Sequence, residues 1–254
     1  MPIEREVTAI VKTFERPKSL DRLVRSIRQF YPGLHIIVAD DSFQPAPVDQ
    51  AEYIRLAPDS GVSAGRNACL ARVQTPYFAL VDDDNEFSRE TRLETLLTTI
   101  RTFDVDVAAG SYVRCKRRMF WIRQKPEPFV GMISRRGPHL TITPGCRTIK
   151  PGLIRCDLAH NFFVARTESI RYMGGWANEL KINEHAEFFV RLQEHGLKVA
   201  YCPEVTVRHW FERSANYAQF RDRNFWPVAA RLMGITSLTD MAGRVRQFPA
   251  SRAA

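Results

Sequence analysis

The segment Phe78-Ala-Leu-Val-Asp-Asp-Asp-Asn-Glu-Phe87 is an apolar run that ends abruptly in three consecutive aspartates. Its apolar part has the composition of a buried β-strand. In an extended segment alternate side chains point to the same side, so Asp82 and Asp84 project together. Their carboxylate oxygens are the ligands that hard divalent cations prefer. The segment therefore predicts a cation site at a strand end, with a solvated acidic turn as the alternative.

Strand-like and helix-like segments alternate along the first 110 residues. Apolar, β-rich runs at residues 7–11, 34–39, 53–56, 77–81 and 104–109 are separated by amphipathic stretches at residues 19–30, 63–73 and 89–102. This order predicts an α/β fold with a mostly parallel central sheet flanked by helices. In such sheets ligands bind at the carboxyl ends of the strands.

Residues that are mostly polar follow three of these predicted strands and would line that edge. They are Thr13, Phe14, Arg16, Asp40, Asp41 and residues 82–84, of which only Phe14 is apolar. A nucleotide bound there would meet backbone groups, a carboxylate able to accept from its base or ribose, and metal-held phosphates. The sequence contains neither the GxxxxGKS/T pattern nor the GxGxxG pattern, so the metal must take the role of the phosphate cradle.

The formal net charge of +9 is unevenly placed. Residues 114–136 hold eight Lys/Arg against one Glu, and residues 213–254 hold seven Arg against two Asp. Both regions contain aromatic residues. This pattern fits nucleic acid, an anionic membrane face or a phosphorylated substrate, and an arginine-rich surface that only solubilises is the alternative.

Targeting and redox signals are few. No apolar run approaches the roughly 20 residues that a spanning helix needs, and the N-terminus lacks the layout of a signal peptide. The five cysteines include no CxxC pair, so we expect reduced thiols. We therefore expect a cytoplasmic chain, with peripheral contact at the inner membrane face as a further option.

The second half departs from the strand–helix alternation. Residues 111–155 contain five prolines and predict hairpins and loops on the acceptor side of the sheet. Asn183 is a candidate cap for a helix over residues 184–195. Two last strands, at residues 198–201 and 204–207, would deliver His209. The tail after residue 213 is expected to be helical at best.

Read in order, these segments resemble the GT-A nucleotide-sugar glycosyltransferases of the family 2 type over about residues 5–212. The motifs that carry the resemblance are Val11-Lys-Thr-Phe-Glu-Arg16, Val38-Ala-Asp-Asp-Ser42, Gly61-Val-Ser-Ala-Gly-Arg-Asn67, Val81-Asp-Asp-Asp84, Asn161-Phe-Phe163, Gly175-Trp176 and Glu184-His-Ala-Glu-Phe-Phe-Val-Arg191 leading to His209. The residues of these motifs are similar to those of the animal ganglioside beta-1,4-N-acetylgalactosaminyltransferases.

The resemblance implies a Rossmann-like GT-A domain over residues 1–212, with a nucleotide-sugar half at residues 1–110 and an acceptor half at residues 111–212. Residues 213–254 would form a basic C-terminal extension. The implied activity is metal-dependent, inverting transfer of a hexose or N-acetylhexosamine from a UDP-sugar to a glycan or glycolipid hydroxyl, as in polysaccharide biosynthesis. The implied cofactor is Mn²⁺ or Mg²⁺.

The resemblance also implies residue roles. The nucleotide sugar would contact Thr13, Phe14, Arg16, Asp40, Asp41, Arg66, Asp82 and Asp83; the metal would contact Asp82, Asp84 and His209; and the acceptor would contact Asn161 and Trp176. Two alternatives stay open, because Arg66 could cap a helix and His209 could be an ordinary buried histidine.

The catalytic base is where the sequence departs from the family pattern. His185 stands where the family has an aspartate, and Glu184 and Glu187 flank it. An imidazole with a free pKa of about 6.5 is able to act as a base, and so is a carboxylate. The alternatives are an ion pair of Glu187 with Arg191 and packing of His185 over Phe189.

Two other classes of protein remain open. A nucleic-acid or anionic-membrane binding module would use the basic regions, and its binding would depend steeply on salt without needing a metal. A sugar nucleotidyltransferase would also use strand-end carboxylates and a divalent ion, but it would release pyrophosphate. Neither needs the motifs at residues 161–209, and nucleic acid is the less favoured partner.

Overall fold

The protein is built around a mixed β-sheet, seen here in a computed structural model that describes residues 2–117, 122–211, 218, 220 and 222–249. In spatial order its main strands are β10 (Arg147–Lys150), β11 (Leu153–Cys156), β13 (Val199–Trp210), β6 (Val107–Arg117), β12 (Phe163–Arg166), β4 (Tyr77–Asp82), β1 (Val7–Thr13), β2 (His35–Asp40) and β3 (Glu52–Arg55). Two more strands join it, since β5 (Asn85–Glu86) pairs with β13 and β7 (Ile122–Glu127) pairs with β6.

Most of the central strands point the same way. Strands β1, β2, β3 and β4 are parallel, β12 is antiparallel to both β4 and β6, and β13 is parallel to β6. The carboxyl ends of β1, β2, β4, β6 and β13 therefore meet at one edge. The prediction of an α/β fold with a mostly parallel central sheet is confirmed.

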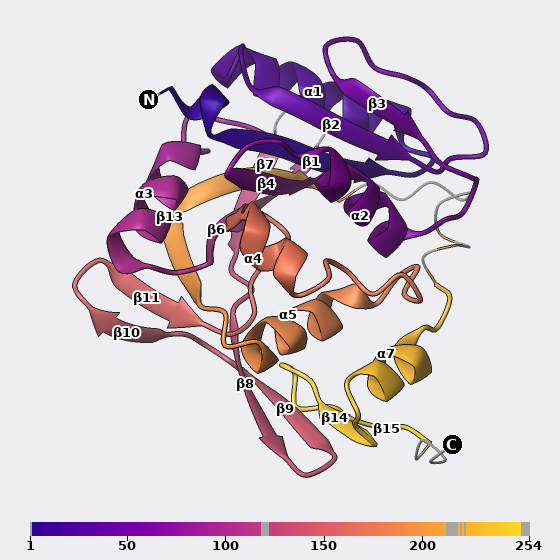
Figure 1. Cartoon of the computed structure of the whole chain (residues 1–254), viewed down its shortest axis with the longest axis vertical. Coiled ribbons are helices and arrows are strands. Elements are labelled where there is room, and N and C mark those ends of the chain that lie inside the picture. The colour runs from indigo at the N-terminus through magenta and orange to yellow at the C-terminus, as the bar shows by residue number, and fades with distance from the viewer. Residues whose placement is uncertain (1, 118–121, 212–217, 219, 221, 250–254) are drawn as a thin grey trace.

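Helices cover both faces of this sheet (Figure 1). On one face, α1 (Pro17–Phe30) and α3 (Leu93–Phe103) bury their apolar stripes against the strands. On the other, α2 (Val62–Arg72), α4 (Thr167–Tyr172) and α5 (Glu184–Glu194) do the same. The apolar spacing of α1 predicts its buried side, and a proline at its first position suits a helix start. In the described part of the chain no helix is long and apolar enough to cross a bilayer.

The predicted hairpin region contains β6–β7, β10–β11 and a further hairpin, β8 (Gly131–Arg136) with β9 (His139–Pro144). Strand β9 also pairs with β14 (Ser237–Thr239), which pairs with β15 (Val245–Gln247) after helix α7 (Trp226–Leu232). The expectation of a C-terminal tail that is helical at best is therefore wrong. Strand β14 depends on β9, a partner far away in the sequence, which local patterns do not reveal.

Two other local expectations need correction. The two predicted last strands form one strand, β13, with a register shift between Tyr201 and Thr206. Asn183 precedes α5 but does not cap it with its side chain, because its backbone is left-handed (φ +62°). Its side-chain oxygen instead accepts a hydrogen bond of 3.1 Å from the backbone N–H of Phe225.

Gly110 marks a crowded point where β6 passes the segment before β12. A Cβ atom there would lie 2.5 Å from the ring of Phe162 and 2.6 Å from the carbonyl oxygen of Val205. Gly110→Ala should therefore destabilise the fold by about 1–3 kcal/mol in urea unfolding, the usual range for overpacking. Gly33→Ala is the matched control, since its Cβ would meet only the flexible side chain of Glu4, at 3.2 Å. Equal stability of the two variants would contradict this packing.

Candidate active site

The register of the parallel strands brings their polar ends to one level. Thr13 lies beside Asp40, and Lys12 lies beside both Ala39 and Asp82. The residues that follow β1, β2 and β4 therefore face a common space, as the rule for ligand sites in parallel sheets predicts.

Arg16 lies over the two carboxylates that follow Asp82. Its Nη1 donates to Asp84 Oδ2 at 2.8 Å, its Nε donates to Asp83 Oδ2 at 3.2 Å, and its Nη2 donates to Asp83 Oδ1. The hydroxyl of Thr13 also donates to Asp83, at 2.8 Å. Both aspartates are buried, so this guanidinium supplies the positive charge that allows them to stay ionised side by side.

The environment separates the pKa values of these two carboxyl groups. Burial raises the pKa of Asp83 to about 6, although Arg16 opposes the shift. Burial also opposes the ionisation of Asp84, but Arg16 and His209 outweigh it and hold the pKa of Asp84 below its usual range. Asp84 therefore stays ionised over a wider pH range than Asp83.

His209 reaches Asp84 because β5 pairs with β13. Asn85 lies opposite His209, and the backbone N–H of Trp210 donates to the carbonyl oxygen of Asp84 at 2.9 Å. His209 Nε2 then lies 3.6 Å from Asp84 Oδ2, and its Nδ1 lies 3.5 Å from a carboxylate oxygen of Glu127. Burial works against protonation, but Asp84 raises the pKa of His209 above its ordinary value.

The donor types and spacing at Asp84 and His209 fit a divalent cation. The distance of 3.6 Å between His209 Nε2 and Asp84 Oδ2 is longer than a hydrogen bond. It is also below the roughly 4.2 Å that separates two ligand atoms on opposite sides of an ion, each bonded to it at about 2.1 Å. Among the described residues no preassembled group of three or more metal-ligating side chains occurs. Magnesium is commonly held by one or two carboxylates together with substrate phosphates. Asp84 and His209 thus fit a cation that arrives with a phosphate-bearing ligand, whereas the third predicted ligand, Asp82, does not form a preassembled group with them.

Arg66 links the acidic strand end to α5. Its Nη2 donates to Asp82 Oδ1 at 3.0 Å, and its Nη1 donates to Glu184 at 2.8 Å. The other carboxylate oxygen of Asp82 accepts from the Tyr112 hydroxyl at 3.3 Å. The guanidinium also lies 5.6 Å from the centroid of a Trp176 ring. This geometry makes Arg66 part of the site wall and not a helix cap.

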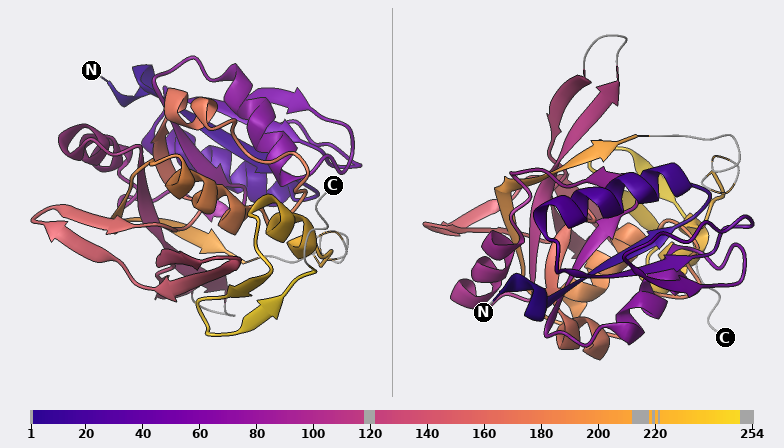
Figure 2. Two further views of the ribbon diagram at one scale, coloured as in Figure 1. Left: turned by 60° about the horizontal axis from the view of Figure 1, so that its bottom comes forward. Right: turned by 90° about the horizontal axis from the view of Figure 1, so that it is seen from above.

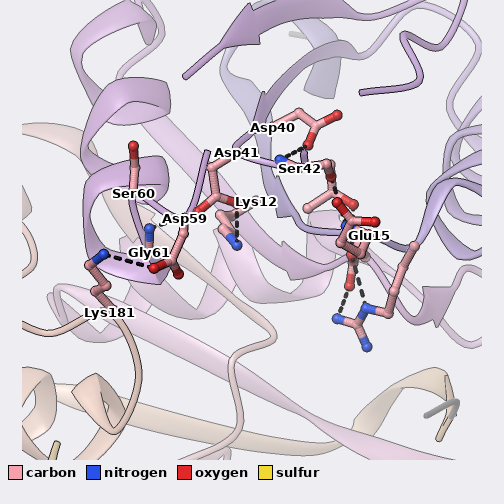
Figure 3. A network of polar contacts seen from close by, with 12 residues as sticks. Lys12, Glu15, Asp40, Asp41, Ser42, Asp59, Ser60, Gly61 and Lys181 are labelled. Carbon is pink, nitrogen blue, oxygen red and sulfur yellow. Dashed lines mark hydrogen bonds and ion pairs between the residues drawn. The ribbon is translucent and has the colours of Figure 1, made fainter. Parts of the chain in front are cut away.

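At the other end of the edge, Asp41 pairs with Lys12, whose side chain is 11% exposed (Figure 3). Lys12 Nζ lies 2.7 Å from Asp41 Oδ1, and the backbone N–H of Gly61 donates to Asp41 Oδ2 at 2.7 Å. Burial lowers the pKa of Lys12, although Asp41 opposes that shift. Gly61 has a φ of +98°, and a Cβ there would lie 2.5 Å from the Cα of Lys181, so only glycine fits.

Asp40 has a different place from its neighbour Asp41. One of its carboxylate oxygens accepts from the backbone N–H of Ser42 at 2.8 Å, and the other accepts from the hydroxyl of Tyr53 at 2.5 Å. Both oxygens are satisfied within the structure that follows β2. The oxygens of Asp41 also have partners, but Asp41 lies in the wall of the cavity described below, whereas Asp40 does not.

A cavity of about 730 Å³ runs along this edge, within the range usual for small-molecule sites. The predicted residues in its wall are Phe14, Arg16, Asp41, Arg66, Asp82, Asp83, Asp84, Asn161, Glu184, His185 and His209. Four predicted residues lie outside the wall, namely Thr13, Asp40, Trp176 and Glu187.

The sequence did not single out several other residues of the wall. Lys181 Nζ donates to Asp59 at 2.9 Å, and Arg223 donates two hydrogen bonds to Asp59, at 2.8 and 2.6 Å. Lys12 could have been noticed as a charged residue inside an apolar strand. Arg223 belongs to the basic C-terminal region, but nothing in the sequence connects it with Asp59.

One ring nitrogen of His185 is held by the backbone. Its Nε2 lies 2.7 Å from the carbonyl oxygen of Ala159, and a carbonyl only accepts, so Nε2 carries a proton and in the neutral ring Nδ1 keeps its lone pair. The ring packs against Phe129 and Phe189, with centroids 5.5 and 5.1 Å away. Burial lowers its pKa below the ordinary value of about 6.5.

The two glutamates beside His185 already have partners. Glu184 pairs with Arg66. Glu187 is buried and accepts from Arg191 Nε at 2.5 Å and from Nη2 at 3.3 Å, which is the i,i+4 pair that the sequence left as an alternative. Burial raises the pKa of Glu187. The geometry therefore favours His185 over either glutamate as the base.

The two predicted acceptor residues are placed differently. Asn161 lies in the cavity wall. Trp176 is buried, its ring stacks on Phe188 with centroids 4.6 Å apart and an interplanar angle of 6°, and its carbonyl oxygen accepts from Asn67 at 2.7 Å. Trp176 thus belongs to the core beneath the cavity, and its role towards an acceptor stays a prediction.

Comparison with known proteins places the chain in a family. Residues 8–158 match the family described as Glycosyl transferase family 2. The chain is 34% identical over 211 residues to beta-1,4 N-acetylgalactosaminyltransferase 2 of Mus musculus, covering 82% of this chain and 40% of the relative. It is 33% identical over 238 residues to beta-1,4 N-acetylgalactosaminyltransferase 1 of Homo sapiens, covering 85% and 43%. The chain thus spans about two fifths of the length of these relatives.

Solved structures agree on the architecture. A crystal structure of GalNAc-T7 with UDP, GalNAc and Mn²⁺ matches with a TM-score of 0.65 at 14% identity, covering 85% of this chain and 47% of that one. A structure of S. aureus TarS 1-349 matches with a TM-score of 0.54 at 17% identity, covering 81% and 60%. The family match and the shared architecture together establish that this chain belongs to glycosyl transferase family 2 and has the GT-A fold.

Proposed function

We propose that this chain transfers a hexose or N-acetylhexosamine from a UDP-sugar to a hydroxyl group of a glycan or glycolipid, with inversion and with Mn²⁺ or Mg²⁺. The observation that carries the proposal is that one cavity holds Asp84, His209, Arg66 and His185 together. The names of the two relatives support the sugar, because both are N-acetylgalactosaminyltransferases. The GalNAc-T7 structure, which contains UDP and Mn²⁺, supports the donor and the metal.

The cavity offers separate places for the parts of a UDP-sugar. Asp41, with Lys12 and the backbone of Gly61 behind it, provides an acceptor for the base or ribose. Asp84 and His209 would hold the divalent ion, which offsets the diphosphate charge and stabilises it as a leaving group. Arg66, in α2, donates to Asp82 and also pairs with Glu184 of α5. The donor sugar would then lie between the acidic strand end and His185.

His185 is the proposed general base. The acceptor oxygen forms a bond to the anomeric carbon while the bond from that carbon to the diphosphate breaks, and the hydroxyl proton passes to His185 Nδ1. The contact of Nε2 with Ala159 fixes the tautomer that leaves this nitrogen available. Glu184 lies next to it in the wall but is paired with Arg66.

Metal-dependent nucleotide binding is the first test. UDP should raise the melting temperature only with Mn²⁺ or Mg²⁺, because without the cation the acidic strand end repels the diphosphate. Asp84→Asn, which keeps its shape and can still accept from Arg16, should fold but lose this effect. Asp49→Asn, at an exposed position, is the control and should behave as wild type. Stabilisation by UDP in excess chelator, or a normal response of Asp84→Asn, would reject the proposed metal site.

The identity of the base can be tested by comparing two positions on α5. His185→Ala should lower kcat by about 10²-fold or more with little change in UDP binding, because a positioned base typically contributes that much. Glu187→Gln keeps the shape of a side chain outside the cavity wall and should cost far less. The opposite ranking in steady-state assays that measure released UDP would make Glu187 the base.

The pH dependence of kcat/KM gives an independent test. His185 must be unprotonated to accept a proton, and burial lowers its pKa, so activity should persist as pH falls through 6.5 and be lost only at lower pH. In His185→Ala the residual activity should not show this loss at low pH, which forms the acid limb of the pH profile. Retention of the limb would assign it to another group, such as Asp83, whose pKa is raised to about 6.

A further inference from the structure

The hairpin formed by β6 and β7 extends beyond the edge of the sheet that carries the cavity. Figure 2 (right) shows its two strands standing out from the rest of the chain. Its base adjoins the site, because Arg114 in β6 lies opposite His209 in β13 and Cys115 lies opposite Trp210. The exposed arms of the hairpin are therefore close to the mouth of the cavity.

The described residues of the arms carry a dense positive charge. The cations are Arg114, Lys116, Arg117, Arg123 and Lys125, and the one acidic residue is Glu127. All five cations are exposed. Arg114 forms an ion pair with Glu127, whereas the other four form none with any carboxylate of the described residues.

The pairing of the arms places like charges opposite one another. Lys116 lies directly opposite Arg123, and Arg114 lies opposite Lys125. Like charges at directly opposed positions of an antiparallel pair destabilise it. This arrangement works against the hairpin in isolation, and an anionic surface outside the chain would relieve it.

Exposed apolar side chains accompany these cations. Ile122 at the start of β7 is 47% exposed, and Phe211 after β13 is 59% exposed. The joining residues 118–121 lie outside the described part of the chain. Basic side chains mixed with exposed apolar ones suit the interface of a bilayer, where the charge meets the headgroups and the apolar groups enter the acyl boundary. Binding to nucleic acid would not explain why Ile122 is exposed.

We infer that the β6–β7 hairpin docks the protein on an anionic lipid surface, with the cavity mouth close to that surface. The attraction acts within a Debye length, about 8 Å at physiological salt, so the exposed arms must approach the headgroups directly. The docking does not depend on the transferase activity. Only its consequence, the presentation of a glycolipid acceptor to the cavity, rests on the proposed function.

The test is co-sedimentation of the full chain with vesicles of phosphatidylcholine alone or with about 30% phosphatidylglycerol, near physiological salt. The hairpin variant is Lys116→Gln, Arg123→Gln and Lys125→Gln, and the control is Arg25→Gln, Arg89→Gln and Arg147→Gln. Both variants lose three positive charges from exposed positions, so a difference between them reports the place of the charge and not its amount. Melting temperatures of both variants check that they are folded.

Wild type and control should bind the anionic vesicles and not the neutral ones, and the hairpin variant should bind the anionic vesicles about tenfold more weakly or worse. High salt should weaken the binding of wild type. Equal binding by the hairpin variant and the control would overturn the inference. So would wild-type binding to neutral vesicles alone, or binding to single-stranded RNA with none to vesicles.

A second measurement separates this inference from the proposed function. The UDP-dependent and Mn²⁺-dependent rise in melting temperature should be the same in the hairpin variant as in wild type, because none of the three cations lies in the cavity wall. Lipid binding without any response to UDP would support the docking and reject the transferase proposal. A response to UDP without lipid binding would reject the docking and support the transferase proposal.

Discussion

The fold and the site both depend on the balance of buried charge at the end of β4. Asp82, Asp83 and Asp84 lie next to one another, and two unit charges 4 Å apart repel by about 4 kcal/mol at an effective dielectric constant of 20. Arg16 offsets this from the β1 side, and Arg66 does so from α2. Because these arginines come from different strand–helix units, the carboxylates gain both partners only when the sheet has formed. The same charges then line the cavity.

The edge of the sheet that carries the cavity could be predicted from the sequence, because strand ends are visible in local patterns. An apolar run followed by carboxylates shows where a strand ends, and alternation with helices shows that the ends share one side. Asp41, Asp82 and Asp84 reach one cavity for that reason. His209 reaches it through the pairing of β5 with β13. The two-residue strand β5 is too short to be visible as a pattern, so the resemblance to a family was needed to connect His209 with the site.

The parts that could not be predicted depend on distant partners. β14 forms because Leu238 lies opposite Leu140 in β9, and the C-terminal residues thereby enter the core beside α5. Asn183 has the right residue type for a helix cap, yet its side chain serves the backbone of Phe225 instead. Glu187 shows the reverse case, since its spacing to Arg191 was sufficient to suggest the ion pair that the structure contains. Local rules succeed where both partners lie within one element.

The contacts of Arg16 bear on how a metal and a nucleotide would enter together. Arg16 Nη1 lies 2.8 Å from Asp84 Oδ2, the same oxygen that His209 faces at 3.6 Å. A divalent ion alone would have to share this oxygen with a guanidinium, and the two positive charges repel. A diphosphate removes the conflict, because its oxygens can pair with Arg16 as well as with the ion. If Asp84 holds the proposed ion, we expect it to bind the ion weakly by itself and more strongly together with a nucleoside diphosphate.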